Sequence, residues 1–138
     1  MKRLAIFLAI LLAAITASAQ EDDVQKYEGK IGDFNITAVY MSLRDIGDAN
    51  VGDSIGYYYY NDRPKTKFTL RLKDYDEEPV PNETSFYMAY TIILDEYTPK
   101  GFKSGTFEGH THHCGYYNGT FTNSQGKEYD FSIDINCH

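Results

Sequence analysis

The chain has 138 residues and a formal charge of −7, from 13 Lys and Arg against 20 Asp and Glu. A chain this acidic, without a clustered stripe of Lys and Arg, is a poor binder of nucleic acid or of an anionic membrane. Its length is that of one ordinary domain, and its 13 Tyr and 8 Phe favour strands over helices.

The first 19 residues have the three parts of a secretory signal peptide. Met1-Lys2-Arg3 is the charged start, residues 4–15 are an apolar run, and Ala17-Ser18-Ala19 has the small residues of a cleavage site. The apolar run is too short to cross a bilayer as a stable helix. We therefore expect residues 1–19 to be removed, leaving residues 20–138 as one domain with no stable membrane anchor, located in the periplasm or secreted.

Without Lys2 and Arg3, eleven basic residues stand against 20 acidic residues, a formal charge of −9. This excess supports solubility, and it also suits a basic extracytoplasmic protein as a partner.

Short aromatic or β-branched segments then alternate with turn residues along the whole remaining chain. Eight strands at this spacing, joined by hairpin-sized turns, predict an all-β fold: a single antiparallel up-and-down barrel, with a β-sandwich as the alternative. The predicted strands are 27–31, 34–43, 51–60, 66–75, 85–97, 102–109, 114–122 and 128–137.

Several short motifs along these strands carry a resemblance. They are Tyr27-x-Gly29, Gly56-Tyr57-Tyr58-Tyr59, Glu96 before a turn, Gly105-Thr106-Phe107-x-Gly109, Gly119-Thr120-Phe121 and Phe131-x-Ile133. In this order the motifs resemble small secreted bacterial meander-barrel domains, which are loosely similar to the avidin and lipocalin architectures. The resemblance implies the barrel fold and export. It transfers no binding residue, and the Trp that usually anchors a lipocalin barrel floor has no counterpart because the chain lacks Trp.

The two cysteines lie on the last two predicted strands. A two-residue turn at Gln125-Gly126 would place Thr122 opposite Tyr129 and Cys114 opposite Cys137. Cross-strand Cβ separations and an oxidising compartment both suit a disulfide. A bulge at Gly126 would shift the pairing by one residue, and we expect the disulfide in either register. The alternation along residues 129–137 predicts that Tyr129, Phe131 and Ile133 face the core.

All four histidines lie in the last 29 residues, and they are the candidate metal ligands. His113 and His138 would be neighbours on the outer face if the cysteines pair, and His110 and His112 would project to one side of a strand. Imidazoles with a carboxylate suit Zn²⁺ or Cu²⁺. A structural zinc site normally has four ligands, and four cannot be assembled on one face. We therefore favour a solvated polar turn here and assign no metal or other cofactor.

The run Tyr57-Tyr58-Tyr59-Tyr60 places two rings on each face of its strand. One pair belongs in the core. The other pair, with Tyr40 or Tyr87 nearby, is the candidate for an exposed aromatic binding patch, and ordinary cross-strand packing of these rings is the favoured interpretation.

No motif of a nucleophile elbow, a metalloprotease helix or a phosphate loop is found. The sequence predicts no catalytic residues. It predicts an exported, non-catalytic binding protein that engages another protein as an inhibitor or immunity factor. A small-ligand-binding barrel is the alternative, and metal binding or enzymatic activity is less favoured.

Overall fold

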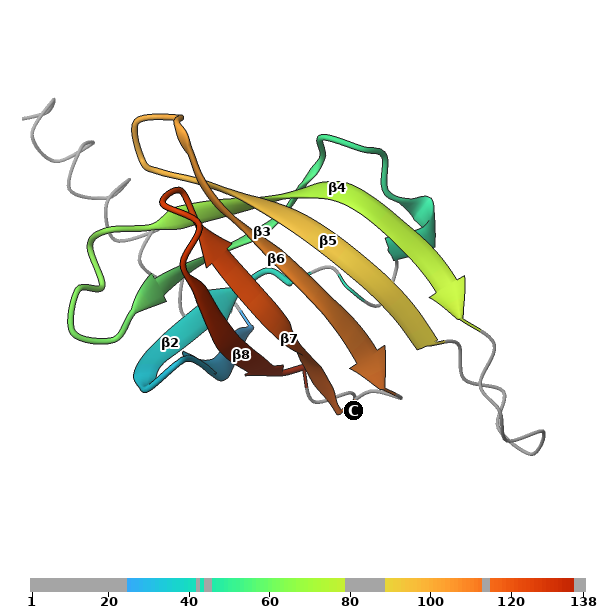
Figure 1. Cartoon of the computed structure of the whole chain (residues 1–138), viewed down its shortest axis with the longest axis horizontal. Helices are drawn as coiled ribbons and strands as arrows, with labels where there is room; N and C mark the ends of the chain where they lie inside the picture. Colours follow the sequence, from blue (N-terminus) through green and yellow to red (C-terminus); the bar gives the residue numbers. More distant parts are fainter. Residues whose placement is uncertain (1–24, 42, 44–45, 79–88, 113–114, 136–138) are drawn as a thin grey trace, which may run out of the picture.

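The computed structural model describes residues 25–41, 43, 46–78, 89–112 and 115–135. Eight antiparallel strands follow one another around one closed barrel, in which the last strand also pairs with the first. The up-and-down barrel predicted from the sequence is therefore confirmed. Figure 1 shows the strands wrapped around a common interior, with β4 and β5 as long curved ribbons across the front. The strands are β1 Lys26–Ile31, β2 Phe34–Val39, β3 Ser54–Tyr60, β4 Phe68–Glu78, β5 Ala89–Tyr97, β6 Lys103–His112, β7 Tyr116–Asn123 and β8 Glu128–Asp134.

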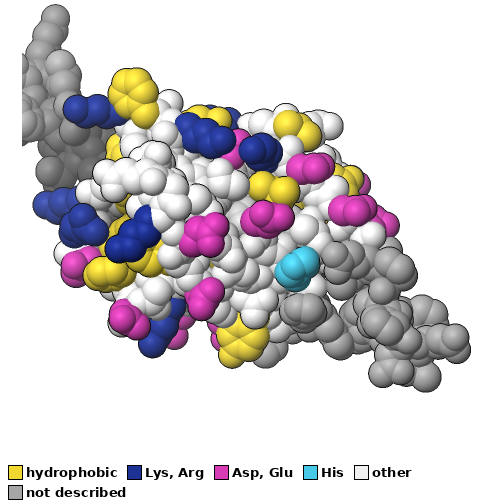
Figure 2. Space-filling view, in the orientation of Figure 1, with side chains coloured by type: hydrophobic (Ala, Val, Ile, Leu, Met, Phe, Trp, Pro, Cys, Tyr) yellow, Lys and Arg dark blue, Asp and Glu magenta, His cyan; other side chains and the backbone are white. Residues whose placement is uncertain are grey.

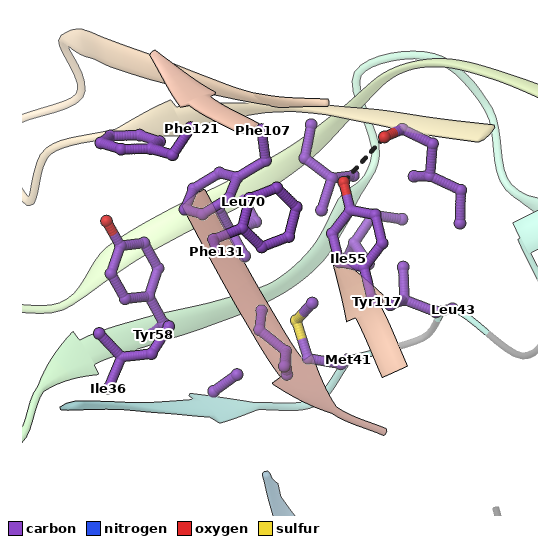
Figure 3. Close-up of a cluster of buried hydrophobic side chains, with 14 of the residues drawn as sticks. Ile36, Met41, Leu43, Ile55, Tyr58, Leu70, Phe107, Tyr117, Phe121 and Phe131 are labelled. Atoms are coloured by element: carbon purple, nitrogen blue, oxygen red, sulfur yellow. Dashed lines mark hydrogen bonds between the residues drawn. The ribbon is translucent and has the colours of Figure 1, made fainter. Parts of the chain in front are cut away.

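The alternation of side chains along each strand places one face of every strand in the barrel interior. On β5, Ile92 and Leu94 are buried, and on β8 the buried residues are Phe131 and Ile133. Figure 3 shows the rings that fill the interior, with Tyr58 and Phe121 toward one end of the cluster and Met41 and Leu43 toward the other. An eight-stranded barrel is just wide enough for side chains to fill in this way.

The two ends of the barrel differ. At one end, which we call the closed end, Met41, Leu43 and Ile46 of the connection between β2 and β3 are buried in the core. A short 3₁₀ helix, η1 (Ile46–Asp48), forms part of this connection. The hydroxyl of Tyr75 donates a hydrogen bond to the Gly47 carbonyl at 3.3 Å, which ties the helix to β4.

Among the described residues, no helix is long and apolar enough to cross a membrane.

The other end, which we call the open end, carries the turns that join β1 to β2, β3 to β4, β5 to β6 and β7 to β8. These turns lie together at the left of Figure 1. They are hairpin turns between neighbouring strands, so each begins and ends on the rim of the barrel. The open end is therefore a rim of four short loops around the barrel axis.

The turn between β7 and β8 corrects the predicted register. Thr122 pairs with Glu128, and Phe121 pairs with Tyr129, so the pairing is displaced by one residue from that of a two-residue turn. Residues 124–127 separate the two strands, and Gly126 adopts a positive φ of 81° that favours glycine. The hydrogen bond from the Gly126 N–H to the Asn123 carbonyl closes the turn at 3.0 Å. The alternative with a bulge at Gly126 is thus the observed one, and the predicted core face of β8 is unchanged.

Close approach of two strands explains a glycine pair in the sheet. Gly109 on β6 lies directly opposite Gly119 on β7. A Cβ on Gly119 would collide with the backbone carbonyl oxygen of Glu108 and would lie 2.6 Å from the Gly109 Cα. Only glycine therefore fits at position 119 without moving β6.

Candidate functional site

A pocket of about 220 Å³ opens at the open end of the barrel. Its walls are apolar and aromatic, and its polar groups come from four side chains. The apolar and aromatic lining residues are Ile31, Phe34, Tyr60, Phe121 and Tyr129. The polar lining residues are Arg63, Glu96, Ser104 and Asn123. A concave, mostly apolar site with a few polar groups is the usual form of a small-molecule pocket.

Glu96 lies at the inner side of this pocket because of its position on β5. It continues the alternation of Ile92 and Leu94, which places its side chain on the interior face, and it is only 3% exposed. Its neighbour Asp95 projects to the outer face, where it forms an ion pair with Lys103 at 3.2 Å. A carboxyl group this deeply buried needs hydrogen-bonding partners to offset the loss of water.

Two hydroxyl groups supply those partners from different strands. The Tyr58 hydroxyl on β3 donates to Glu96 Oε2, and the Ser104 hydroxyl on β6 donates to Glu96 Oε1 at 2.7 Å. The pairing of β5 with β6 shifts between Glu96 and Tyr97, and this irregularity skips Ser104. Bulges commonly redirect a side chain next to a site, and here the bulged Ser104 reaches the carboxyl group.

Burial governs the acid–base behaviour of this group. Loss of solvent raises the pKa of Glu96, and the hydrogen bonds from Tyr58 and Ser104 lower it in part. Burial also raises the pKa of Tyr58 far above its usual range, and the nearby Glu96 carboxylate raises it further. Tyr58 therefore stays protonated and acts as a donor, while Glu96 is the group of this cluster that changes its protonation state.

Two cations stand over the aromatic walls of the pocket. The Arg63 guanidinium lies 5.2 Å from the ring centroid of Tyr60, and the Lys127 ammonium lies 5.2 Å from that of Tyr129. Both distances fall within the range of cation–π contacts. Arg63 belongs to the turn between β3 and β4, and Lys127 to the turn between β7 and β8, so the two cations approach from opposite sides of the mouth.

In the part of the chain that the structure describes, no Lys, Arg or His side chain forms an ion pair with Glu96. The inner side of the pocket, which we call its floor, therefore carries a carboxyl group whose hydrogen-bond donors are neutral. The two cations, Arg63 and Lys127, belong to the turns at the mouth. Such an arrangement can hold a small molecule with its apolar body against the rings and its polar groups at the two ends.

The tyrosine run divides between the two faces as the sequence predicts. Tyr58 is buried in the core, and Tyr60 lies on the same face, where it lines the pocket. Tyr57 projects outward, and its ring centroid lies 6.0 Å from that of Tyr40. The Lys67 ammonium lies 5.4 Å from the ring centroid of Tyr57. An outer group of Tyr40 and Tyr57 is thus present, whereas Tyr87 lies outside the described residues.

Of the four candidate metal ligands, the structure describes the side chain of His110 alone. His110 is exposed on β6, where its Nδ1 lies 3.0 Å from the Thr91 hydroxyl. His112 ends β6, and the structure does not describe its side chain; His113 and His138 lie outside the described residues. Among the described residues, no group of three or more His, Cys, Asp or Glu is arranged to hold a metal ion.

Both cysteines, Cys114 and Cys137, also lie outside the described residues. The register that placed them opposite each other is wrong for the pairs that the structure describes, because the β7–β8 pairing is displaced by one residue. The disulfide stays a prediction.

Sequence reasoning missed Glu96 as a site residue. Adjacent residues of a strand point to opposite faces, so Asp95 and Glu96 do not share a site: Asp95 faces outward and Glu96 is buried. The signal that identifies Glu96 is its phase: it follows Ile92 and Leu94 at intervals of two, so it is a carboxyl group on the core face of a strand. A buried carboxyl group in such a position is a candidate for function.

Comparison with known proteins identifies no family for this chain. No family model, no curated protein sequence and no solved structure matches the chain.

Proposed function

We propose that this protein is an exported, small-ligand-binding β-barrel whose ligand occupies the pocket over Glu96. The observation that carries the proposal is the pocket of about 220 Å³ at the open end, with aromatic walls and a buried carboxyl group at its floor. Export follows from the predicted signal peptide in residues 1–19, and the predicted disulfide would suit that compartment.

The size of the pocket limits the ligand. Pockets for drug-sized molecules usually measure about 300–1,000 Å³, so this pocket suits a smaller molecule, such as one with a single ring. The rest of the barrel interior is filled by side chains, including Phe107, Phe131 and Tyr117. The ligand therefore sits at the mouth rather than deep along the barrel axis.

A methyl group at each end of the barrel allows a direct test. Ile31 lines the pocket, and Ile46 is buried at the closed end. We expect mixtures of small neutral, cationic and anionic compounds to include some that shift the NMR signal of the Ile31 methyl group and leave that of Ile46 in place. If no compound of any charge shifts the Ile31 signal selectively, the pocket is not a ligand site.

A protein partner is the second candidate function, and the charge of the outer wall favours it. Asp74 on β4 and Glu108 on β6 flank Ile93 of β5, and Asp76 continues the same face of β4. Figure 2 shows acidic side chains over this face. Such a surface suits a basic extracytoplasmic protein, with this chain as an inhibitor or immunity factor, because complementary charge speeds and orients association.

Native mass spectrometry of the protein recovered from its host's envelope and medium tests this second candidate. A bound polypeptide supports it, and the association rate with that partner should then fall as salt rises. An association rate that ignores salt, or recovery of the chain with only a small-molecule mass, contradicts it.

A further inference from the structure

Charge is distributed unevenly between the two ends of the barrel. The four turns of the open end contain five basic residues, Arg63, Lys65, Lys67, Lys100 and Lys127, and two acidic residues, Asp33 and Asp62. Figure 2 shows the Lys and Arg side chains gathered toward this end. The open end is thus a basic rim on a chain whose overall charge is strongly negative.

The closed end has the opposite character. The described part of the connection between β2 and β3 contains Asp48 and Asp53 and no Lys or Arg. The far end of β4 adds Asp76 and Glu77, both exposed, against one basic residue at the start of β1, Lys26. A separation of charge along the barrel axis creates a field that draws an anion toward the open end and repels it from the closed end.

The basic rim is also in contact with the pocket itself. Arg63 lines the pocket and stands over Tyr60, and Lys127 stands over Tyr129 from the opposite turn. Arg63, whose Nε lies 3.8 Å from Asp62 Oδ1, therefore lies at the pocket itself, and Lys127 lies beside the lining ring of Tyr129. The rings of Phe34 and Phe121 offer apolar surface to the body of a ligand.

We propose that the pocket selects a small organic anion, with an apolar or aromatic body against the rings and its acidic group between Arg63 and Lys127. This inference rests on the proposed function and names its ligand class. A cation at the same place would meet the rim charges, and a neutral molecule would gain nothing from them.

The carboxyl group at the floor makes this binding depend on pH. A bound anion disfavours the ionised form of Glu96, so binding favours its protonated form. Burial already raises the pKa of Glu96, and a bound anion raises it further. The titratable and charged groups that face Glu96 are Tyr58 and Tyr60 of β3, Arg63 of the next turn and Tyr129 of β8.

Because both tyrosines of β3 have a raised pKa, Glu96 is the group whose titration governs the affinity. Anion affinity should fall as pH rises through the pKa of Glu96, by at most about tenfold per pH unit for one proton.

Three compounds of one shape and different charge provide the test: benzoate, benzyl alcohol and benzylamine. Binding to the full protein is measured by calorimetry and by the Ile31 methyl signal. We expect benzoate to bind at least about tenfold more tightly than benzylamine, with benzyl alcohol between them. Tighter binding of benzylamine, equal binding of benzoate and benzyl alcohol, or no binding of all three overturns this inference.

Substitutions of single basic residues test which cations attract benzoate. Arg63→Gln and Lys127→Gln should each weaken benzoate binding by about threefold, as expected for exposed charges, and should leave benzyl alcohol unchanged. Lys26→Gln removes one positive charge at the start of β1, next to the closed end. It should change neither the affinity for benzoate nor the affinity for benzyl alcohol. If Lys26→Gln and Arg63→Gln weaken benzoate binding equally, the basic rim does not select the anion.

Glu96→Gln tests the contribution of the buried carboxyl group apart from that of the basic rim. It should bind benzoate at least as tightly as the wild type at neutral pH and should remove the pH dependence. Asp95→Asn removes an outward carboxylate from the same strand and should retain the pH dependence of the wild type. A loss of benzoate binding in folded Glu96→Gln, checked by circular dichroism, would overturn the proposal. The fragment experiment with mixed charges decides the proposed function separately, since it does not depend on which charge binds.

Discussion

The hydroxyl of Tyr58 donates a hydrogen bond to the carboxyl group of Glu96 inside the barrel. Tyr58 lies on β3 and Glu96 on β5, and β4 separates these strands in the sheet. The bond therefore joins two strands that share no backbone pairing. It also fixes the carboxyl group at the base of the pocket, where the ring of Tyr58 stacks on Phe68 of the intervening strand at 5.3 Å between centroids.

Replacing the Tyr58 hydroxyl should reveal how much this bond stabilises the fold. Tyr58→Phe keeps the ring but leaves the buried Glu96 carboxyl with one fewer donor, and we expect a loss of about 1–3 kcal/mol in the free energy of unfolding. Urea denaturation measures it. Tyr59→Phe is the matched control, because its ring projects outward, and its change should stay within about 0.5 kcal/mol. Equal losses in the two variants would argue against a stabilising bond.

The stability of the protein should depend on pH through Glu96. Its pKa in the folded state is raised above the ordinary value of 4.5, so between those two values the folded state binds more protons than the unfolded state. The stability gained from the protonated group is therefore complete below pH 4.5 and is lost as pH rises through the folded pKa.

Glu96→Gln cannot titrate, so it isolates this effect. Its free energy of unfolding relative to the wild type should rise from pH 4.5 upward and level off above the folded pKa. Unfolding measured across pH for both proteins checks this, with Asp95→Asn as the control for loss of one negative charge. A difference that falls with increasing pH would contradict the raised pKa.

Gly119 should not tolerate a side chain. Gly119→Ala would force its Cβ against the backbone of Glu108 and Gly109 on the neighbouring strand, and overpacking of this kind costs about 1–3 kcal/mol. Thermal or urea unfolding measures the loss. Gly47→Ala is the control, since nothing lies within 4 Å of a Cβ built there, and it should be close to neutral. A neutral Gly119→Ala would mean that β6 and β7 lie farther apart.

The turn between β7 and β8 should prefer glycine for its backbone conformation. Gly126 has a positive φ of 81° and open space around it, so Gly126→Ala should cost about 1–2 kcal/mol through conformation alone. Gly126→Asn should cost less, because Asn adopts this region more readily. If Ala and Asn destabilise the protein equally in urea denaturation, the loss does not come from the backbone angle.

Much of the fold could be predicted because its signals are local. The alternation of Phe131 and Ile133 with Ser132 identifies the core face of β8 from neighbouring residues alone. Turn residues mark the strand ends in the same way. The β7–β8 register was less certain, because one extra residue in the loop at Gly126 displaces every pair, and the sequence permits both loop lengths.

The candidate site was harder to predict because its parts are far apart in the chain. Tyr58, Glu96 and Ser104 meet only after the barrel has closed, and the contact of Ser104 depends on a shift in the β5–β6 pairing. The basic rim was hidden in the same way. Arg63, Lys65 and Lys67 are close together in the sequence, but Lys100 and Lys127 are distant from them. An up-and-down barrel brings every second turn to the same end, which gathers these residues on one rim.

The sequence by itself thus determined the class of fold, the eight strands and the inward faces, because side-chain period and turn chemistry act between near neighbours. Only the tertiary structure decided which end of the barrel is open, which carboxyl group is buried there and which charges surround it. These properties depend on closure of the barrel, since burial and electrostatic environment are set by residues from all of its strands.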